Sequence, residues 1–174
     1  MISNSVFLVD TNALITPYQQ YYPFDFAKSF WDQIRSCIES GKIAILDMVK
    51  LELQNGDEND PLKRWIEETE IQLFVDHREP SILEQYANVL QYVQDCGFYN
   101  DTALATWSQL TVADPWLIAT AKAKGYVLVT FETNIHVLDE KNKTKRVRIP
   151  DVANHFGVKI VNLFDMMREL RVHL

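Results

Sequence analysis

The stretch that decides the fold lies near the start of the chain, where residues 5–15 are SVFLVDTNALI. Residues 6–9 form a short apolar run, which is typical of a strand buried in a parallel sheet. The run ends at Asp10, and the chain becomes apolar again at residues 13–15. Asp is a common residue where a strand enters a turn, but the same position would suit a site that needs a negative charge. The rest of the sequence bears on this choice.

The composition is that of a globular protein. A length of 174 residues suits a single domain over residues 1–174, and an apolar fraction of 47% is enough for one sizeable core. No apolar stretch is as long as a membrane span and no signal peptide precedes Val6, so we expect a cytoplasmic protein without a membrane partner. Cys37 and Cys96 lie far apart without metal-ligand spacing, which predicts free thiols in the core of a cytosolic protein.

The charge of the chain is negative overall but contains one basic segment. A net charge of −7 argues against a surface that attracts nucleic acid over its whole extent. Residues 141–148, KNKTKRVR, nevertheless hold five cations in eight positions. Such a run is usual in a solvated loop and would also suit a loop that contacts phosphate groups. In the second case the candidate RNA contacts are Lys141, Lys143, Lys145, Arg146 and Arg148.

Strand-like runs alternate with helical periodicity along the chain, which indicates an α/β protein with a mainly parallel sheet. The expected strands cover residues 6–9, 43–46, 73–75, 126–130 and 158–161. The expected helices lie at residues 24–40, 47–55, 61–69, 81–95, 115–124 and 163–170. No repeat, low-complexity tract or interior linker divides the chain.

Two acidic residues follow predicted strands, Asp10 after residues 6–9 and Glu132 after residues 126–130. Ligands of open parallel sheets bind outside the carboxyl ends of the strands, near the point where the strand order reverses. Each acid taken alone also fits an ordinary turn. Asp114 is similarly ambiguous, because Asp before Pro is a good helix N-cap. The same position places it on the helix face of Leu117, Ile118 and Ala121, which should be buried against the sheet.

Glu52 lies in the predicted helix DMVKLELQ of residues 47–54. At about 100° of rotation per residue, it falls among Met48, Val49, Leu51 and Leu53, opposite Lys50 and Gln54. An ionised carboxylate in apolar surroundings costs several kcal/mol unless a partner offsets it. Because no Lys or Arg lies on this face, Glu52 needs a cation from elsewhere or a position at the rim of a cleft. A core-edge Glu that reaches solvent is the alternative.

Four acids that converge at one end of a sheet would repel one another, so some would hold protons unless a divalent cation were bound. Carboxylate ligands without Cys or His favour Mg²⁺ or Mn²⁺ over zinc. The four histidines are scattered and show no ligand spacing.

The four acids, in this order, resemble the site of PIN-domain proteins, a family of small metal-dependent nucleases. The resemblance rests on Leu8-Val9-Asp10-Thr11-Asn12, on Leu51-Glu52-Leu53, on the helix start at residues 113–121, ADPWLIATA, and on Val129-Thr130-Phe131-Glu132. The last motif has Glu where the family has Asp, so Asp151 remains an alternative fourth acid. Residues 21–26, YYPFDF, and Phe131-Glu132 resemble a prokaryotic branch described mainly as a domain of unknown function.

The resemblance covers nearly the whole chain, and it implies a three-layer α/β/α fold with a central, mainly parallel sheet. It also implies a ribonuclease that cleaves single-stranded RNA with Mg²⁺ or Mn²⁺ held by Asp10, Glu52, Asp114 and Glu132. Thr11, Asn12 and Thr130 would orient the ligands or bound water. Many prokaryotic relatives are VapC-like toxins, which implies an antitoxin protein partner and a homodimer. Tyr21 and Tyr22 would either pack in the core or stack a base at the mouth of the cleft.

Two other functions remain open. Aspartyl phosphotransfer of the haloacid dehalogenase type also places Asp after the first strand, but it needs a second Asp two residues later, where this chain has Asn12. A PIN-like fold that only binds RNA or a protein is the non-enzymatic alternative, and Glu132 is the position that would have lost its role.

Overall fold

A five-stranded sheet forms the centre of the molecule in the computed structural model, which describes residues 5–174. Every pair of neighbouring strands in this part of the chain is parallel. In sheet order the strands are β3 (Leu73–Val75), β2 (Ile43–Leu46), β1 (Phe7–Val9), β4 (Val127–Val129) and β5 (Ile160–Val161). The prediction of a parallel α/β sheet is therefore confirmed.

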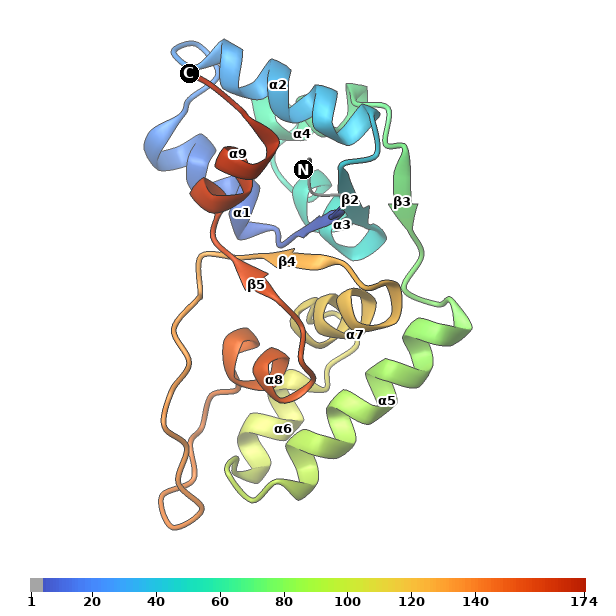
Figure 1. The fold of residues 1–174 in the computed structure, drawn as a ribbon, viewed down its shortest axis with the longest axis vertical. Helices are drawn as coiled ribbons and strands as arrows, with labels where there is room; N and C mark the ends of the chain where they lie inside the picture. The colour runs from blue at the N-terminus through green and yellow to red at the C-terminus, as the bar shows by residue number, and fades with distance from the viewer. Residues whose placement is uncertain (1–4) are drawn as a thin grey trace.

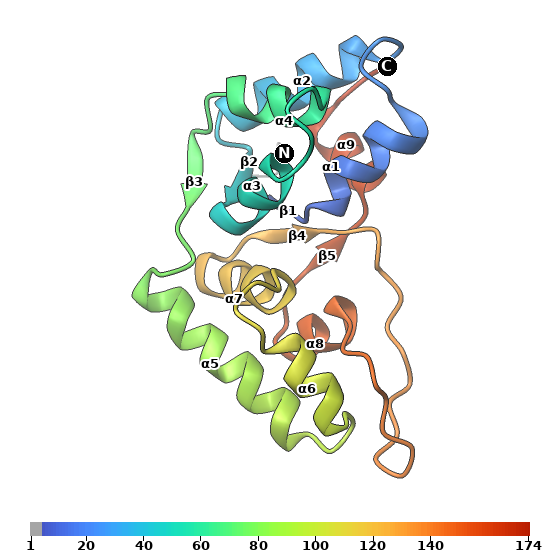
Figure 2. The ribbon, with the colours of Figure 1, turned by 180° about the vertical axis from the view of Figure 1, so that it is seen from behind.

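Helices cover both faces of this sheet. On one side lie α1 (Asn12–Thr16), α2 (Lys28–Glu39), α4 (Pro61–Glu68) and α9 (Leu163–Leu170), as Figure 1 shows. On the other side lie α5 (Pro80–Asp95), α6 (Asp101–Trp107), α7 (Asp114–Lys124) and α8 (Ile149–His155), and the reverse view in Figure 2 agrees. The π-helical turn η1 (Pro17–Tyr21) continues α1, and α3 (Asp47–Gln54) follows β2 directly. The arrangement is the expected three-layer α/β/α sandwich.

The central strands are apolar throughout because helices cover both of their faces. All residues of β1, β2 and β4 are buried. Phe7 pairs with Ile43 on one side and with Val127 on the other, so the chain leaves β1 toward β2 and later returns beside β1 through β4. The strand order therefore reverses at β1, and its carboxyl end lies at the position where open α/β sheets bind ligands.

Most predicted helices are confirmed at their expected places. Asp60 caps α4 by accepting a hydrogen bond of 2.9 Å from the amide of Leu62, as the Asp-Pro pair predicts. Helix α7 ends at Gly125, whose left-handed φ of 69° suits a residue without Cβ. Of the two cysteines, Cys37 is buried and Cys96 is half-buried, and both are free.

The predicted helix of residues 24–40 begins four residues late, at Lys28. Pro23 is the physical reason, because its carbonyl accepts hydrogen bonds from the amides of Phe26 and Ala27 and closes a separate turn. The apolar pattern of this segment still predicts packing in the core correctly, because the ring of Phe24 stacks on Trp31 with centroids 4.3 Å apart.

Four short elements were not predicted: α1, η1, α6 and α8. Each is five to seven residues long, too short to show a helical period. The cap of α6 was readable, since the Asn100 side chain accepts from the amide of Ala103 at 2.9 Å. Within residues 5–174, no helix has both the length and the apolar character needed to span a membrane.

Candidate active site at the carboxyl edge of the sheet

Asp10 stands between β1 and α1, at the point where the strand order reverses. Its amide continues the sheet by donating to the carbonyl of Val129 at 2.9 Å, and its own carbonyl accepts from the amide of Ala13 at 2.9 Å, which starts the helix. The residue is only 6% exposed. Its carboxylate accepts a hydrogen bond of 3.1 Å from the Thr130 hydroxyl and another from the backbone amide of Asn12.

Thr130 connects this acid to the next one along the edge. Its hydroxyl donates to Asp10 and accepts from the backbone amide of Glu132 at 3.2 Å. Thr130 follows β4, the neighbour of β1, and is buried. A single hydroxyl therefore holds Asp10 and the start of the segment that carries Glu132 in fixed relation.

Glu52 reaches the same edge from α3. Met48, Val49 and Leu53 are buried as predicted, whereas Leu51 is 58% exposed, so the apolar face is narrower than the sequence indicated. The exposed Glu52 borders this face at the rim, and its carboxylate accepts a hydrogen bond from the hydroxyl of Thr11. The sequence analysis expected a cation or a rim position for Glu52, or a Glu that reaches solvent. The structure exposes Glu52 at the rim, and its hydrogen-bond donor is the residue directly after Asp10.

Asp114 opens α7 without capping it. The N-cap position is Ala113, and no side chain makes a capping hydrogen bond there, so the capping explanation for Asp114 is wrong. Its carboxylate instead accepts from the indole N–H of Trp107 at 3.4 Å. The helix face behind it is buried as predicted at Leu117, Ile118 and Ala121.

The pKa values show that these acids share one electrostatic environment. Burial, and then the negative charges of Asp114 and Glu52, raise the pKa of Asp10 to about 6, although the hydrogen bonds from Thr130 and Asn12 act in the opposite direction. Burial also raises the pKa of Asp114, and the charges of Glu132 and Glu52 raise it further. The structure therefore brings Asp10, Glu52, Asp114 and Glu132 together at one edge of the sheet.

Arg146 forms an ion pair with one acid of this cluster. Its Nη2 atom donates to Glu132 at 2.6 Å, and its charge lowers the pKa of Asp114 against the effect of burial. The guanidinium comes from the basic segment of residues 141–148 and is largely exposed. One basic side chain of that segment thus contacts a candidate site residue directly.

The other basic residues of the segment have different surroundings. Residues 131–148 form a long loop that extends away from the sheet in Figure 1, and Thr144 pairs with Tyr99 beside the start of α6. Lys141, Lys143 and Lys145 are exposed on this distal part of the loop. Arg148 makes a 3.1 Å contact with Nε2 of His136.

Asp151, the alternative fourth acid, has a different role. It is buried in α8 and accepts a hydrogen bond of 2.7 Å from the backbone amide of His136. Its charge contributes to the raised pKa of Tyr99, whereas Glu132 is the charge that acts on Asp114. Asp151 therefore anchors the loop, and Glu132 is the acid that lies with the other three.

The separation of the four acids matters for metal binding. Among residues 5–174, no three of them have ligand atoms that all lie within 4.8 Å of one another. Their all-carboxylate donor set nevertheless fits a hard divalent cation such as Mg²⁺ or Mn²⁺. Burial first, and then repulsion from Asp114 and Glu52, raises the pKa of Asp10, and a bound cation would offset both effects.

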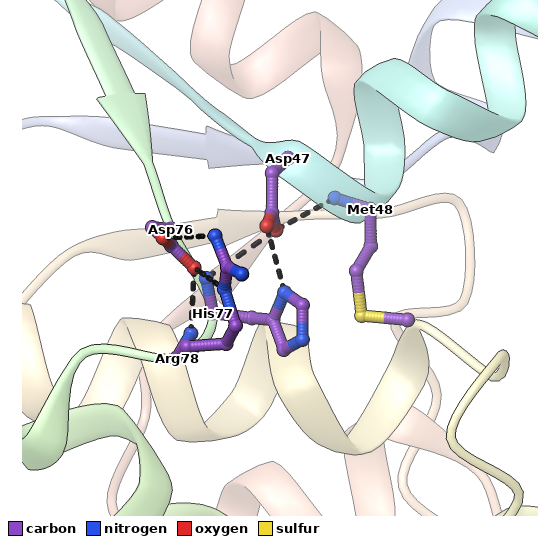
Figure 3. A network of polar contacts seen from close by, with 5 residues as sticks. All are labelled: Asp47, Met48, Asp76, His77 and Arg78. Atoms are coloured by element: carbon purple, nitrogen blue, oxygen red, sulfur yellow. Dashed lines mark hydrogen bonds and ion pairs between the residues drawn. The ribbon is translucent and has the colours of Figure 1, made fainter.

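A second group of three potential metal ligands does have its ligand atoms within 4.8 Å of one another, and the sequence analysis missed it. Asp47 follows β2, and Asp76 and His77 follow β3 (Figure 3). Nδ1 of His77 lies 2.7 Å from a carboxylate oxygen of Asp47, while Arg78 binds Asp76 through two nitrogens at 2.9 and 2.8 Å. Because a charged or hydrogen-bonding partner already engages each acid, we interpret this group as a clamp between β2 and β3. The sequence signal that could have identified this group is that its acids follow predicted strands.

Replacing His77 by Phe is expected to lower the free energy of unfolding by about 1 kcal/mol, because the hydrogen bond to Asp47 is lost while a ring remains against Trp116. Urea denaturation at pH 7 measures the change. Arg78→Ala is the control, since its ion pair with Asp76 is exposed and should contribute much less to the free energy of unfolding. Equal losses in the two variants would contradict the assignment of the clamp to His77.

The aromatic residues before α2 divide between the core and the surface. Tyr22 packs on Phe30 with ring centroids 4.6 Å apart and accepts a hydrogen bond from Trp31 through its carbonyl. Tyr21 is 46% exposed and contacts Phe131 and Phe164. The packing alternative thus holds for Tyr22, whereas Tyr21 lies at the surface beside the segment that carries Glu132.

The fold and the site together define a class: a three-layer α/β protein with a parallel sheet and clustered carboxylates at the carboxyl edge. Residues 7–174 match the model of a family described as a domain of unknown function, DUF4411. Because this match covers nearly the whole chain, the protein belongs to that family. A comparison with curated proteins found no match.

Proposed function

We propose that the protein is a metal-dependent endoribonuclease of the PIN type that hydrolyses phosphodiester bonds of single-stranded RNA. The observation that carries the proposal is the convergence of Asp10, Glu52, Asp114 and Glu132, from four separate segments, at the point where the strand order of the sheet reverses. A structural role does not explain four neighbouring carboxylates without a matching number of cations.

The four carboxylates would hold Mg²⁺ or Mn²⁺. The metal would supply a Lewis acid that activates water and offsets negative charge on the phosphate. The ligands are already oriented by neighbouring groups of this chain: Thr130 and the amide of Asn12 hold Asp10, Thr11 holds Glu52, and Trp107 holds Asp114. Such hydrogen bonds fix the direction in which a carboxylate presents its free oxygen.

Arg146 would bind the RNA backbone next to the acids. A guanidinium is a planar donor that can hold two phosphate oxygens at once. Arg146 donates one nitrogen to Glu132, which leaves the rest of its exposed fork free to meet a phosphate. The lysines of the distal loop would add long-range attraction for the strand, since the remainder of the surface is acidic overall.

The direct test is cleavage of an unstructured, end-labelled RNA by the purified protein. We expect cuts inside the strand with Mg²⁺ or Mn²⁺ and none with EDTA. Isothermal titration with Mn²⁺ should show binding to the protein without RNA. A protein that binds Mn²⁺ at these acids but cleaves neither RNA nor DNA would refute the nuclease proposal.

The proposal includes the biological setting that the PIN resemblance implies. In that setting the protein is a cytoplasmic toxin, forms a homodimer and is neutralised by an antitoxin protein. Light scattering of the purified chain tests the dimer. A reading frame beside the gene that encodes a small DNA-binding protein would support the antitoxin, and co-purification of its product would test the interaction.

A non-catalytic module that binds RNA or a protein is the second candidate, and the Arg146–Glu132 ion pair favours it. At 2.6 Å this pair already supplies one positive charge to the acidic cluster. If Arg146 were the permanent counter-charge, the wild-type protein would not bind Mn²⁺, because the guanidinium would already offset the acids. The titration described above therefore separates the two functions.

A further inference from the structure

An exposed group of aromatic rings lies beside the acidic cluster. It consists of Tyr21 from η1, Phe131 from the segment after β4, and Phe164 from the first turn of α9; we call it the aromatic patch. The Tyr21 ring stacks on Phe131 with centroids 6.5 Å apart and meets Phe164 edge-on at 6.2 Å. Tyr21 is 46% and Phe164 36% exposed, while Phe131 is half-buried and packs against the core.

Backbone connections place this patch next to the candidate active site. Phe131 lies between Thr130, which donates to Asp10, and Glu132, which pairs with Arg146. Successive Cα atoms are about 3.8 Å apart, so the patch begins within one residue of both contacts. Tyr21 and Phe164 reach it from segments that follow β1 and β5, and these strands also end at the carboxyl edge.

Exposed apolar residues usually occur singly on a protein surface, whereas these aromatic residues are grouped. Among residues 5–174 the exposed aromatic side chains are Tyr21, Phe26, Phe74 and Phe164, and of these only Tyr21 and Phe164 contact each other. Three distant segments keep rings at the surface in one place, although burying them would be favourable. Such rings, next to groups that would hold a phosphate, suit a ligand with a flat apolar face attached to a phosphate.

We propose that the aromatic patch stacks an unpaired nucleobase of the strand whose phosphate lies at the acidic cluster. This inference rests on the proposed function and specifies its substrate, because a base in a duplex is already stacked and cannot lie on the patch. Stacking accepts every base, so the patch selects single-stranded character and not sequence. Tyr21 and Phe164 supply the accessible ring surfaces, and the ring of Phe131 stacks on Tyr21.

The test measures binding in the Asp114→Asn background, with Mn²⁺ and with EDTA. Fluorescence anisotropy compares a labelled oligouridylate with a chain of equal length that lacks bases at consecutive positions. We expect the abasic chain to bind roughly tenfold more weakly. Tyr21→Leu should weaken oligouridylate binding to a similar degree and leave the abasic chain unaffected, whereas Tyr21→Phe should restore binding.

Phe74→Leu is the matched control, because Phe74 is an exposed aromatic on β3, the opposite edge strand from β5. Its oligouridylate affinity should equal that of the parent. The stacking proposal would be wrong if the oligouridylate and the abasic chain bound with equal affinity, or if neither bound. It would also be wrong if Tyr21→Leu changed the oligomeric state. Base-dependent binding in a protein that never cleaves RNA would support the patch and reject the nuclease, so the two failures are distinguishable.

Discussion

Asp10→Asn is expected to lower the rate of metal-dependent RNA cleavage by at least about a thousandfold, because it removes a ligand from the group that holds the cation. The variant should remain folded, since Asn keeps one carbonyl oxygen that can accept the hydrogen bond from the Thr130 hydroxyl. Quantification of labelled fragments over time measures the rate. Isothermal titration should show a matching loss of Mn²⁺ affinity.

Asp76→Asn provides the control for this experiment. Asp76 also follows a strand of the sheet, but Arg78 binds its carboxylate through two nitrogens. Its cleavage rate should stay close to that of the wild type. Wild-type cleavage by Asp10→Asn would show that the acidic cluster is not the active site. A loss of cleavage in both variants would indicate a general requirement for the strand-end carboxylates.

The same substitution is expected to stabilise the metal-free protein at neutral pH, by up to about 3 kcal/mol. Asp10 has a pKa of about 6 in the folded chain against an ordinary value of 3.8, so the folded state binds its proton more tightly than the unfolded state. Above pH 6 the carboxylate is ionised in both states, and the folded state bears the full cost of the buried, repelled charge. Asn carries no charge and avoids that cost.

The sign of this effect reverses the usual expectation for a paired acid. As the pH falls from 6 toward 4, Asp10 takes up its proton in the folded state first, and the wild type gains stability relative to the variant. The difference between the two proteins should therefore be largest above pH 6 and vanish below about pH 4. Urea denaturation in EDTA at pH 7.5, 5.5 and 4 measures the difference.

Glu84→Gln removes the same charge from an exposed position on α5 and should change stability by less than about 0.5 kcal/mol at every pH. Adding Mn²⁺ at pH 7.5 should stabilise the wild type and have a smaller effect on Asp10→Asn, because the bound cation offsets the repulsion. If Asp10→Asn instead destabilises the metal-free protein equally at all three pH values, Asp10 is a structural hydrogen-bond acceptor, and its negative charge does not destabilise the folded state.

Much of the fold could be predicted because buried parallel strands leave continuous apolar runs in the sequence. The runs at residues 43–46 and 73–75 match β2 and β3 residue for residue. Helix limits were less predictable where a proline formed its own turn, as at Pro23, and short helices such as α8 left no period to detect. The Asp-Pro capping signal was correct at Asp60 but failed at Asp114, where Ala113 takes the N-cap position.

The acidic residues were harder to separate by sequence. Asp10, Asp47 and Asp76 all follow strands. Arg78 binds Asp76 within one turn, but only the packed structure shows that His77 engages Asp47. The sequence singled out Glu52 because a charged residue stood on the apolar face of its predicted helix. Its hydrogen-bond partner, Thr11, lies 41 residues away in the chain. Contacts at such separations depend on how the elements pack.

The amino-acid sequence by itself determined which segments become strands and helices, and that an acid follows β1, because both depend on neighbours along the chain. Only the tertiary structure decided which acids repel one another and which hold a partner. The strand order β3-β2-β1-β4-β5 places the ends of β1 and β4 side by side and brings Asp47 beside His77. That order comes from packing between segments distant in the chain, where spacing along one element carries no information.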